Sequence, residues 1–291
     1  MKEYLSPHKW RYLIRMDLFK TLFLIMATGL TLLSARSAAQ GNLLLTPQRV
    51  VFEGSKKIEE LNLANIGKDT ARFVISLINL RMREDGSFDE ITQPDTGQNF
   101  ADKWVRFFPH SVILGPQESQ SVRIQLIHPN AMEPGEYRSH IYFRAIPNEE
   151  PLGEKDSTRD SSISVRLTPV FGISIPVIIR IGPNTTQATL ANLALQWGKE
   201  PTPVMDITFH RDGSMSVYGD VFVDYISPQG KTTRVATVKG LAVYTPIPLR
   251  HFSLALEDRP GVNYHSGHLH ITYAAPGQHK ATIAEGELIL H

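Results

Sequence analysis

The sequence predicts an all-β protein built of two antiparallel sandwiches. Apolar residues alternate or run in short blocks along the chain, turn residues separate these blocks, and no stretch holds a helical period for long. The composition is that of a globular protein, since 42% of the 291 residues are apolar and 20% are charged. Two domains of ordinary size, each with its own core, fit this length.

The first domain is predicted over residues 40–181. Its candidate strands cover residues 43–53, 57–66, 71–82, 121–128, 136–147 and 161–182. Turn residues such as Pro134-Gly135 separate them. Six or seven short antiparallel strands over this length are typical of an immunoglobulin-like sandwich. An aromatic group is assigned to its core rather than to an exposed recognition patch: Trp104, Phe107 and Phe108.

The second domain is predicted over residues 182–291, after a hinge at Gly182-Pro183-Asn184. Its candidate strands cover residues 188–197, 203–211, 215–227, 233–244, 250–257, 267–275 and 281–290. They indicate a second sandwich of the same kind. The polar segment 147–162 reads as a loop between two strands of the first domain rather than as a domain linker, because the sequence after it still has a strand pattern.

Residues 1–39 resemble a secretory signal peptide. Basic residues precede an apolar run over residues 21–33, which is shorter than the roughly 20 residues that a bilayer-spanning helix needs. Small residues at Ser37 and Ala39 predict cleavage after Ala39. Translation could start at Met1 or at Met16, and an uncleaved anchor is the alternative. The mature chain is expected outside the cytoplasm.

Composition and motifs argue against several classes of function. The chain has no cysteine, so a disulfide framework, a thiolate metal site and a cysteine nucleophile are excluded. A formal net charge of +1 gives no reason to expect a nucleic-acid partner. The sequence contains no phosphate-binding loop and no nucleophile elbow. We therefore expect neither an enzyme nor a bound cofactor.

Three histidines lie close together at His265, His268 and His270. The last two would share one face of a strand and could hold zinc or copper with a third ligand. No acidic ligand lies at a convincing spacing. Solvated histidines are the preferred interpretation, and a metal-binding envelope protein is the alternative.

Residues 163–181 form the most informative segment. Every odd position is apolar: Ile163, Val165, Leu167, Pro169, Phe171, Ile173, Ile175, Val177, Ile179 and Ile181. Strict alternation over this length exceeds a usual strand of about 5–6 residues. Two interpretations stay open. The strand either crosses its own domain and covers that core, or it offers its first half to another polypeptide by strand addition.

The order of these segments resembles the PapD-like periplasmic chaperones of pilus assembly. The resemblance rests on the early strand with Arg49, the block around Asn65, residues 107–127 and 135–147, and the long alternating strand that ends in Arg180. It covers nearly all of the first domain and, more loosely, the second. It implies two immunoglobulin-like domains in a boomerang arrangement, located in the periplasm.

The resemblance also implies a function and partners. Such a chaperone binds pilus or fimbrial subunits by donor-strand complementation, needs no ATP, and delivers them to an outer-membrane usher. The donor residues here would be Ile163, Val165, Leu167 and Phe171, with Pro169 a poor member of the row. Self-association through the exposed donor strand is a further implied possibility. An envelope structural or adhesive protein without a transient client is the alternative.

The resemblance assigns Arg49 to the cleft arginine that grips the subunit's terminal carboxylate. The family's second cation, a lysine, aligns with Pro176 and is missing. Arg180 matches an arginine of the interdomain network, whereas Arg138 stands where an acidic residue is usual. These departures indicate a divergent member.

Overall fold

The computed structural model describes residues 43–147, 170–199, 202–277 and 281–291. The signal peptide predicted over residues 1–39 and most of the loop predicted over residues 147–162 lie outside the described residues. The described chain is all-β, with short 3₁₀ turns at η1 (Asp102–Trp104) and η2 (Pro129–Ala131). Among the described residues, no helix is long and apolar enough to cross a membrane.

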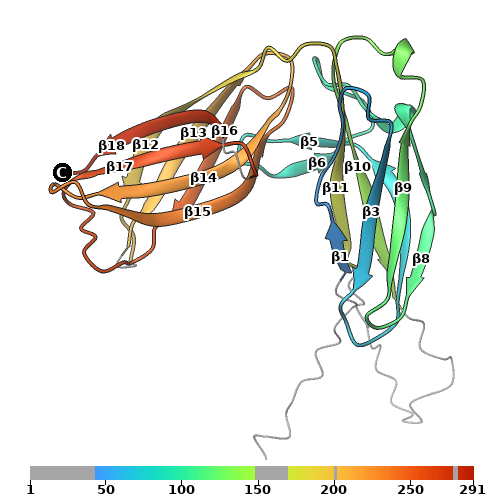
Figure 1. The fold of residues 1–291 in the computed structure, drawn as a ribbon, viewed down its shortest axis with the longest axis horizontal. Coiled ribbons are helices and arrows are strands. Elements are labelled where there is room, and N and C mark those ends of the chain that lie inside the picture. Colours follow the sequence, from blue (N-terminus) through green and yellow to red (C-terminus); the bar gives the residue numbers. More distant parts are fainter. Residues whose placement is uncertain (1–42, 148–169, 200–201, 278–280) are drawn as a thin grey trace, which may run out of the picture. The chain divides into compact units, whose positions relative to one another are not determined.

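The first sandwich consists of two sheets and a small hairpin (Figure 1). One sheet has the order β1 (Leu43–Thr46), β3 (Ile58–Asn65), β9 (Ser119–Leu126), β7 (Val105–Phe108). The other has the order β2 (Val50–Phe52), β11 (Gly172–Ile181), β10 (Gly135–Ile146), β4 (Ala71–Ile78), β8 (Ser111–Leu114). The hairpin pairs β5 (Leu80–Met82) with β6 (Phe88–Glu90).

The second sandwich has a three-stranded and a four-stranded sheet. The first has the order β12 (Gln187–Gln196), β13 (Val204–Asp212), β16 (Leu249–Ala255). The second has the order β15 (Thr232–Val243), β14 (Val217–Ile226), β17 (His268–Ala274), β18 (Thr282–Ile289). The two predicted sandwiches are confirmed. The domain boundary at residues 181 and 182 stays a prediction.

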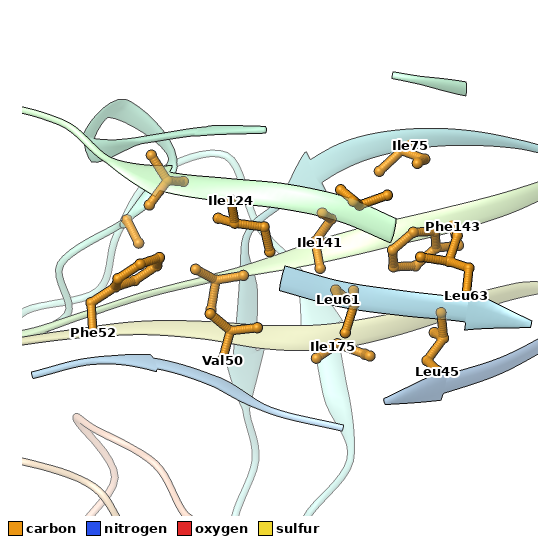
Figure 2. Close-up of a cluster of buried hydrophobic side chains, with 14 of the residues drawn as sticks. Leu45, Val50, Phe52, Leu61, Leu63, Ile75, Ile124, Ile141, Phe143 and Ile175 are labelled. Atoms are coloured by element: carbon orange, nitrogen blue, oxygen red, sulfur yellow. The ribbon is translucent and has the colours of Figure 1, made fainter. Parts of the chain in front are cut away.

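Alternation along each strand builds the core of the first sandwich. In β9, for example, Val122, Ile124 and Leu126 are buried while the residues between them are exposed. Figure 2 shows side chains from both sheets, among them Ile124 and Phe143, meeting between the strands. In strands such as β9, period-two side chains place one face inward, as the sequence pattern predicts.

Three sequence predictions need correction. Residues 43–53 form two strands in different sheets, because the chain leaves the sheet of β1 after Thr46 and enters the sheet of β2 at Val50. Residues 71–82 likewise divide into β4 and β5. Phe108 is 74% exposed and does not join the core, whereas Trp104 and Phe107 pack against it.

Asn65 explains the polar block that the sequence singles out near residue 65. Its side-chain amide donates to the carbonyls of Asp69 at 2.8 Å, Leu114 at 3.0 Å and Gly115 at 3.1 Å. Its Oδ1 accepts from the N–H of Gly67 at 2.9 Å. One buried amide therefore satisfies the backbone of two turns, which is a structural role.

We predict that replacing Phe143 by alanine lowers the free energy of unfolding by about 3–5 kcal/mol, because the ring is fully buried and leaves a cavity. Phe108→Ala is the matched control in the same sandwich. It should change stability by less than about 0.5 kcal/mol, since its ring is exposed. Urea denaturation of both variants measures the difference, and equal losses would contradict the described core.

Candidate functional site

The edge of strand β11 is open over its first half. β10 pairs with β11 along its whole length, from Gly172 to Ile181. On the other side β2 pairs only with Val177–Ile179. In the described part of the chain, no strand covers the stretch from Gly172 to Pro176 on that side. The N-terminal half of β11 is thus paired with β10 on one edge and unpaired on the other.

The unpaired edge presents backbone hydrogen-bonding groups. The N–H of Ala145 in β10 donates to the carbonyl of Phe171 at 2.9 Å. Since backbone groups alternate in direction along an antiparallel strand, the odd residues of β11 face β10 and Gly172 and Ser174 face outward. Pro176 also faces outward, so its missing N–H removes no bond to β10. This edge can accept another strand.

The odd side chains become more exposed toward the N-terminal end of β11 and at Phe171, the residue before it. Ile175 is 3% exposed, Ile173 is 41% exposed and Phe171 is 59% exposed. Of the predicted donor residues, Phe171 belongs to this exposed row, and Ile163, Val165 and Leu167 lie outside the described residues. Ile173 was not among the predicted residues, although it continues their alternation.

Gly172 adds a local feature that the sequence pattern does not reveal. A Cβ atom built on Gly172 would overlap the ring of Tyr142 in β10. Any larger residue at position 172 would therefore displace the Tyr142 ring, which lies over the strand backbone. Gly172 is the first residue of β11 despite the close approach of the Tyr142 ring.

A cleft of about 850 Å³ is lined by residues of β2 and β11 and by residues of the second sandwich. Arg49, Glu53 and Arg180 from the first sandwich line it together with Ser216 and Tyr218 from the second. Two arginines line this cleft, and the carboxylate of Glu53 lies on the same wall, 3.9 Å from Arg180 Nη1. The two predicted cleft and network arginines, Arg49 and Arg180, therefore line the same cavity.

Arg49 comes directly before β2. The parallel register pairs Val50 with Val177, so Arg49 is the neighbour of Pro176 on the adjacent strand. The Arg49 guanidinium carbon lies 4.3 Å from the centre of the Tyr218 ring. Its Nε is buried and has no hydrogen-bond partner among the described residues. Burial lowers the pKa of Arg49 from its usual value.

Arg180 belongs to a buried network centred on Glu136. The family resemblance places the acidic residue of this network at position 138, two residues later in the chain. The side chain of Glu136 is fully buried, and its Oε2 accepts from Arg180 Nε at 3.2 Å. The interpretation that Arg138 replaces the acid was therefore wrong. Register explains the pairing, because Glu136 is directly opposite Arg180 on β10.

The same carboxylate connects the first sandwich to the second. The N–H of Ser216 donates to Glu136 Oε2 at 3.0 Å, and the Ser216 hydroxyl donates to Oε1. Thr245 Oγ1 is 3.4 Å from Oε1. Arg180 Nη2 in turn donates to the carbonyl of Ser216 at 2.8 Å. Both carboxylate oxygens thus have partners, as a buried charge requires.

Arg138 and His140 continue this face of β10. Arg138 Nη2 donates to the carbonyl of Thr245 at 3.3 Å, and its guanidinium carbon lies 4.4 Å from the centre of the Tyr244 ring. His140 packs edge-on against Phe88 and Tyr244. Burial, followed by the charge of Arg138, lowers the pKa of His140 to about 3. His140 is therefore neutral in the folded protein at ordinary pH.

The C-terminal histidines lie on the second sandwich. His265 stacks on Trp197 with ring centres 4.6 Å apart. His270 Nε2 is 3.9 Å from Glu285 Oε2, and His270 Nδ1 is 4.0 Å from Glu287 Oε1. Across the described ranges, no group of three or more histidine or acidic side chains is arranged to hold a metal ion.

Comparison with protein-family models finds no match, and comparison with curated proteins finds none that is significant. Solved structures do match. The CupB2 chaperone of Pseudomonas aeruginosa is 12% identical, with a TM-score of 0.40 over 85% of this chain and 100% of that one. A structure of the Salmonella enterica SafA pilin with the SafB chaperone matches with 14% sequence identity and a TM-score of 0.40, over 86% of this chain and 97% of that chain. The E. coli chaperone DraB is 13% identical, with a TM-score of 0.39 over 86% of this chain and 97% of that chain.

Each of these three structures contains a protein that is named as a chaperone.

We predict that His140 makes the protein less stable as pH falls from about 6.5 to about 3. The unfolded chain gains a proton at this residue over that range and the folded chain does not. Between pH 7 and pH 5 the loss attributable to His140 should be about 2 kcal/mol. Urea denaturation of wild type and His140→Phe at both pH values measures it.

The matched control for His140→Phe is His210→Phe, because the His210 side chain is exposed. The His140 variant should lose about 2 kcal/mol less than wild type on acidification, and the His210 variant should follow wild type. The same pH dependence in all three proteins would contradict the buried, neutral state of His140.

Proposed function

We propose that this chain is a periplasmic chaperone that binds and stabilises pilus or fimbrial subunits by donor-strand complementation. The observation that carries the proposal is the open edge of β11 with its exposed odd side chains. Strand addition needs free backbone groups along an edge and alternate side chains that fill the partner's pockets. Gly172 and Ser174 supply the former, and Phe171 and Ile173 supply the latter.

The expected partner is a β-rich subunit that lacks one strand of its own sheet. Such a subunit exposes part of its core, and the donated row covers it. Each large apolar side chain that becomes buried contributes about 1.5–3 kcal/mol before the cost of association is subtracted. The predicted donors Ile163, Val165 and Leu167 would extend the same row toward the N-terminal end. No nucleotide is needed, because burial and backbone pairing provide the free energy.

The cleft that Arg49 lines would hold the subunit's chain end. A guanidinium can bind a carboxylate through two parallel charge-assisted hydrogen bonds, and Arg49 lines the cleft with an Nε that has no partner among the described residues. We propose that Arg49 anchors the terminal carboxylate of the subunit. Because Pro176 stands beside it, Arg49 would do so without a lysine from β11.

The remaining parts of the proposal rest on the sequence resemblance and on the predicted signal peptide. The mature chain would begin at Gln40, act in the periplasm and pass its subunits to an outer-membrane usher. The same open edge could pair with a second copy of the chain when no subunit is present.

We predict that Phe171→Asp reduces capture of fibre subunits by at least about tenfold, because it removes one buried aromatic anchor and adds a charge to the contact. Val170→Asp is the matched control. Val170 is the adjacent residue, is 51% exposed and is not one of the predicted donor residues. The measurement is the amount of subunit that co-purifies from the host periplasm, identified by mass spectrometry.

Thermal unfolding of both aspartate variants separates binding from folding. Equal capture by both variants and wild type would contradict donation by this face. Loss of stability in Phe171→Asp alone would assign the residue to the domain's own core. A protein that elutes alone or as a homo-oligomer while subunits are expressed would favour the structural or adhesive alternative.

We predict that Arg49→Ala weakens subunit capture by about tenfold or more, as expected for loss of hydrogen bonds to a charged group. Arg106→Ala is the control, since Arg106 is an exposed arginine on β7 of the same sandwich. The effect of Arg49→Ala should vanish for a subunit carrying extra residues after its natural C-terminus. Unchanged yield with the native subunit would remove Arg49 from the site.

A further inference from the structure

The Arg49 guanidinium is held by an aromatic ring of the second sandwich rather than by an acidic partner. Its central carbon lies 4.3 Å from the centre of the Tyr218 ring. No described residue accepts a hydrogen bond from its Nε, although that atom is buried. The neighbouring strand offers Pro176, whose side chain neither donates nor accepts.

We propose that Tyr218 is a positioning residue for Arg49, which binds a carboxylate in the cleft, and that Gly240 gives the Tyr218 ring its place. The inference rests on the proposed function, because it concerns the same anchor. A guanidinium that stacks by its face keeps its N–H groups free in the plane of the group. The edge that can grip a carboxylate in two hydrogen bonds thus remains available.

The Tyr218 ring is itself fixed from two sides. It packs against a cluster that includes Ile178 of the first sandwich and Ala242 and Tyr244 of the second. It lies in β14 opposite Ala242 of β15. A ring packed in this way offers a firm platform, so that little side-chain freedom of Arg49 remains to be lost on binding.

A bulge between β14 and β15 makes room for the tyrosine hydroxyl. The register shifts between Gly219 and Val221, and Asp220 Oδ1 accepts from the N–H of Gly240 at 3.0 Å. Gly240 has a φ of +72°, and a Cβ atom on it would lie 2.7 Å from the Tyr218 hydroxyl oxygen. Any side chain at residue 240 would push the ring away from its present position.

The cleft wall fits a carboxylate. Arg180 and Ser216 line the same cavity as Arg49 and Tyr218. Arg180 already binds Glu136 and the Ser216 carbonyl and lies 3.9 Å from Glu53, whereas the Nε of Arg49 has no partner among the described residues. The ligand class that this arrangement selects is a single carboxylate group, as at the end of a polypeptide chain.

The test is a titration of the mature protein with sodium acetate at constant ionic strength, followed through the ¹⁵N signal of the Arg49 Nε–H group. Arg49→Lys identifies that signal by its disappearance. Wild type should show a saturable shift. Tyr218→Phe keeps the ring and should bind acetate as wild type does, whereas Tyr218→Leu should bind roughly tenfold more weakly.

Gly240→Ala provides a second, independent arm. It should weaken acetate binding while Tyr218 is present, because the new methyl group meets the hydroxyl. The double variant Tyr218→Phe, Gly240→Ala removes that hydroxyl, and its nearest ring carbon would be 3.3 Å from the new Cβ, so binding should recover. The backbone strain at residue 240 is the same in both variants and cannot explain a recovery.

The outcomes separate this inference from the proposed function. Equal acetate binding in wild type and Tyr218→Leu would overturn the positioning role of Tyr218 and leave the anchor intact. An Arg49 signal that does not respond to acetate in wild type would overturn both the positioning role and the anchor. Strand donation is tested apart from these results by the Phe171→Asp variant.

Discussion

Strand β11 is packed on both faces, and this constraint fixes most of the structure around it. Its odd residues Ile175, Val177 and Ile179 lie in the core of the first sandwich. Its even residues Ile178 and Arg180 contact the second sandwich. A shift of one residue would exchange these two sets and bury Arg180 in the core. The register of β11 is therefore strongly determined, and with it the place where its edge becomes open.

The buried carboxylate of Glu136, which this register places opposite Arg180, connects the two sandwiches. One group accepts from β11 through Arg180 and from the second sandwich through Ser216. A buried ion pair contributes little net stability compared with a well-packed apolar contact, but losing one partner is costly. The network thus favours one arrangement of these strands over alternatives more than it adds to the total free energy of folding.

The sequence predicts features that depend on a single strand and misses those that depend on neighbours across a sheet. Alternation is enough to identify the two sandwiches and the apolar row that includes Phe171, but not to decide whether that row is buried or exposed. It cannot show that Glu136 is opposite Arg180, because that pairing joins residues 44 positions apart in the chain. The contact between Arg49 and Tyr218 is hidden for the same reason.

Local chemistry explains the other differences. Pro47 stands where one predicted strand divides between two sheets, and a proline reads equally well as an edge residue or a turn. The strands β7 and β8 are short and lie at sheet edges, so their pattern is too brief to separate from a loop. Phe108 looks like a core residue by type alone, and only its place on an edge strand exposes it.

Pro176 also determines where an added strand would have to end. On the open edge the outward residues Gly172 and Ser174 each offer one donor and one acceptor, and Pro176 offers only an acceptor. Directly beyond it, at Val177, β2 already occupies the edge. An incoming strand therefore loses its ladder at this residue, so the length of any such pairing is limited by the sheet itself rather than by the length of the partner.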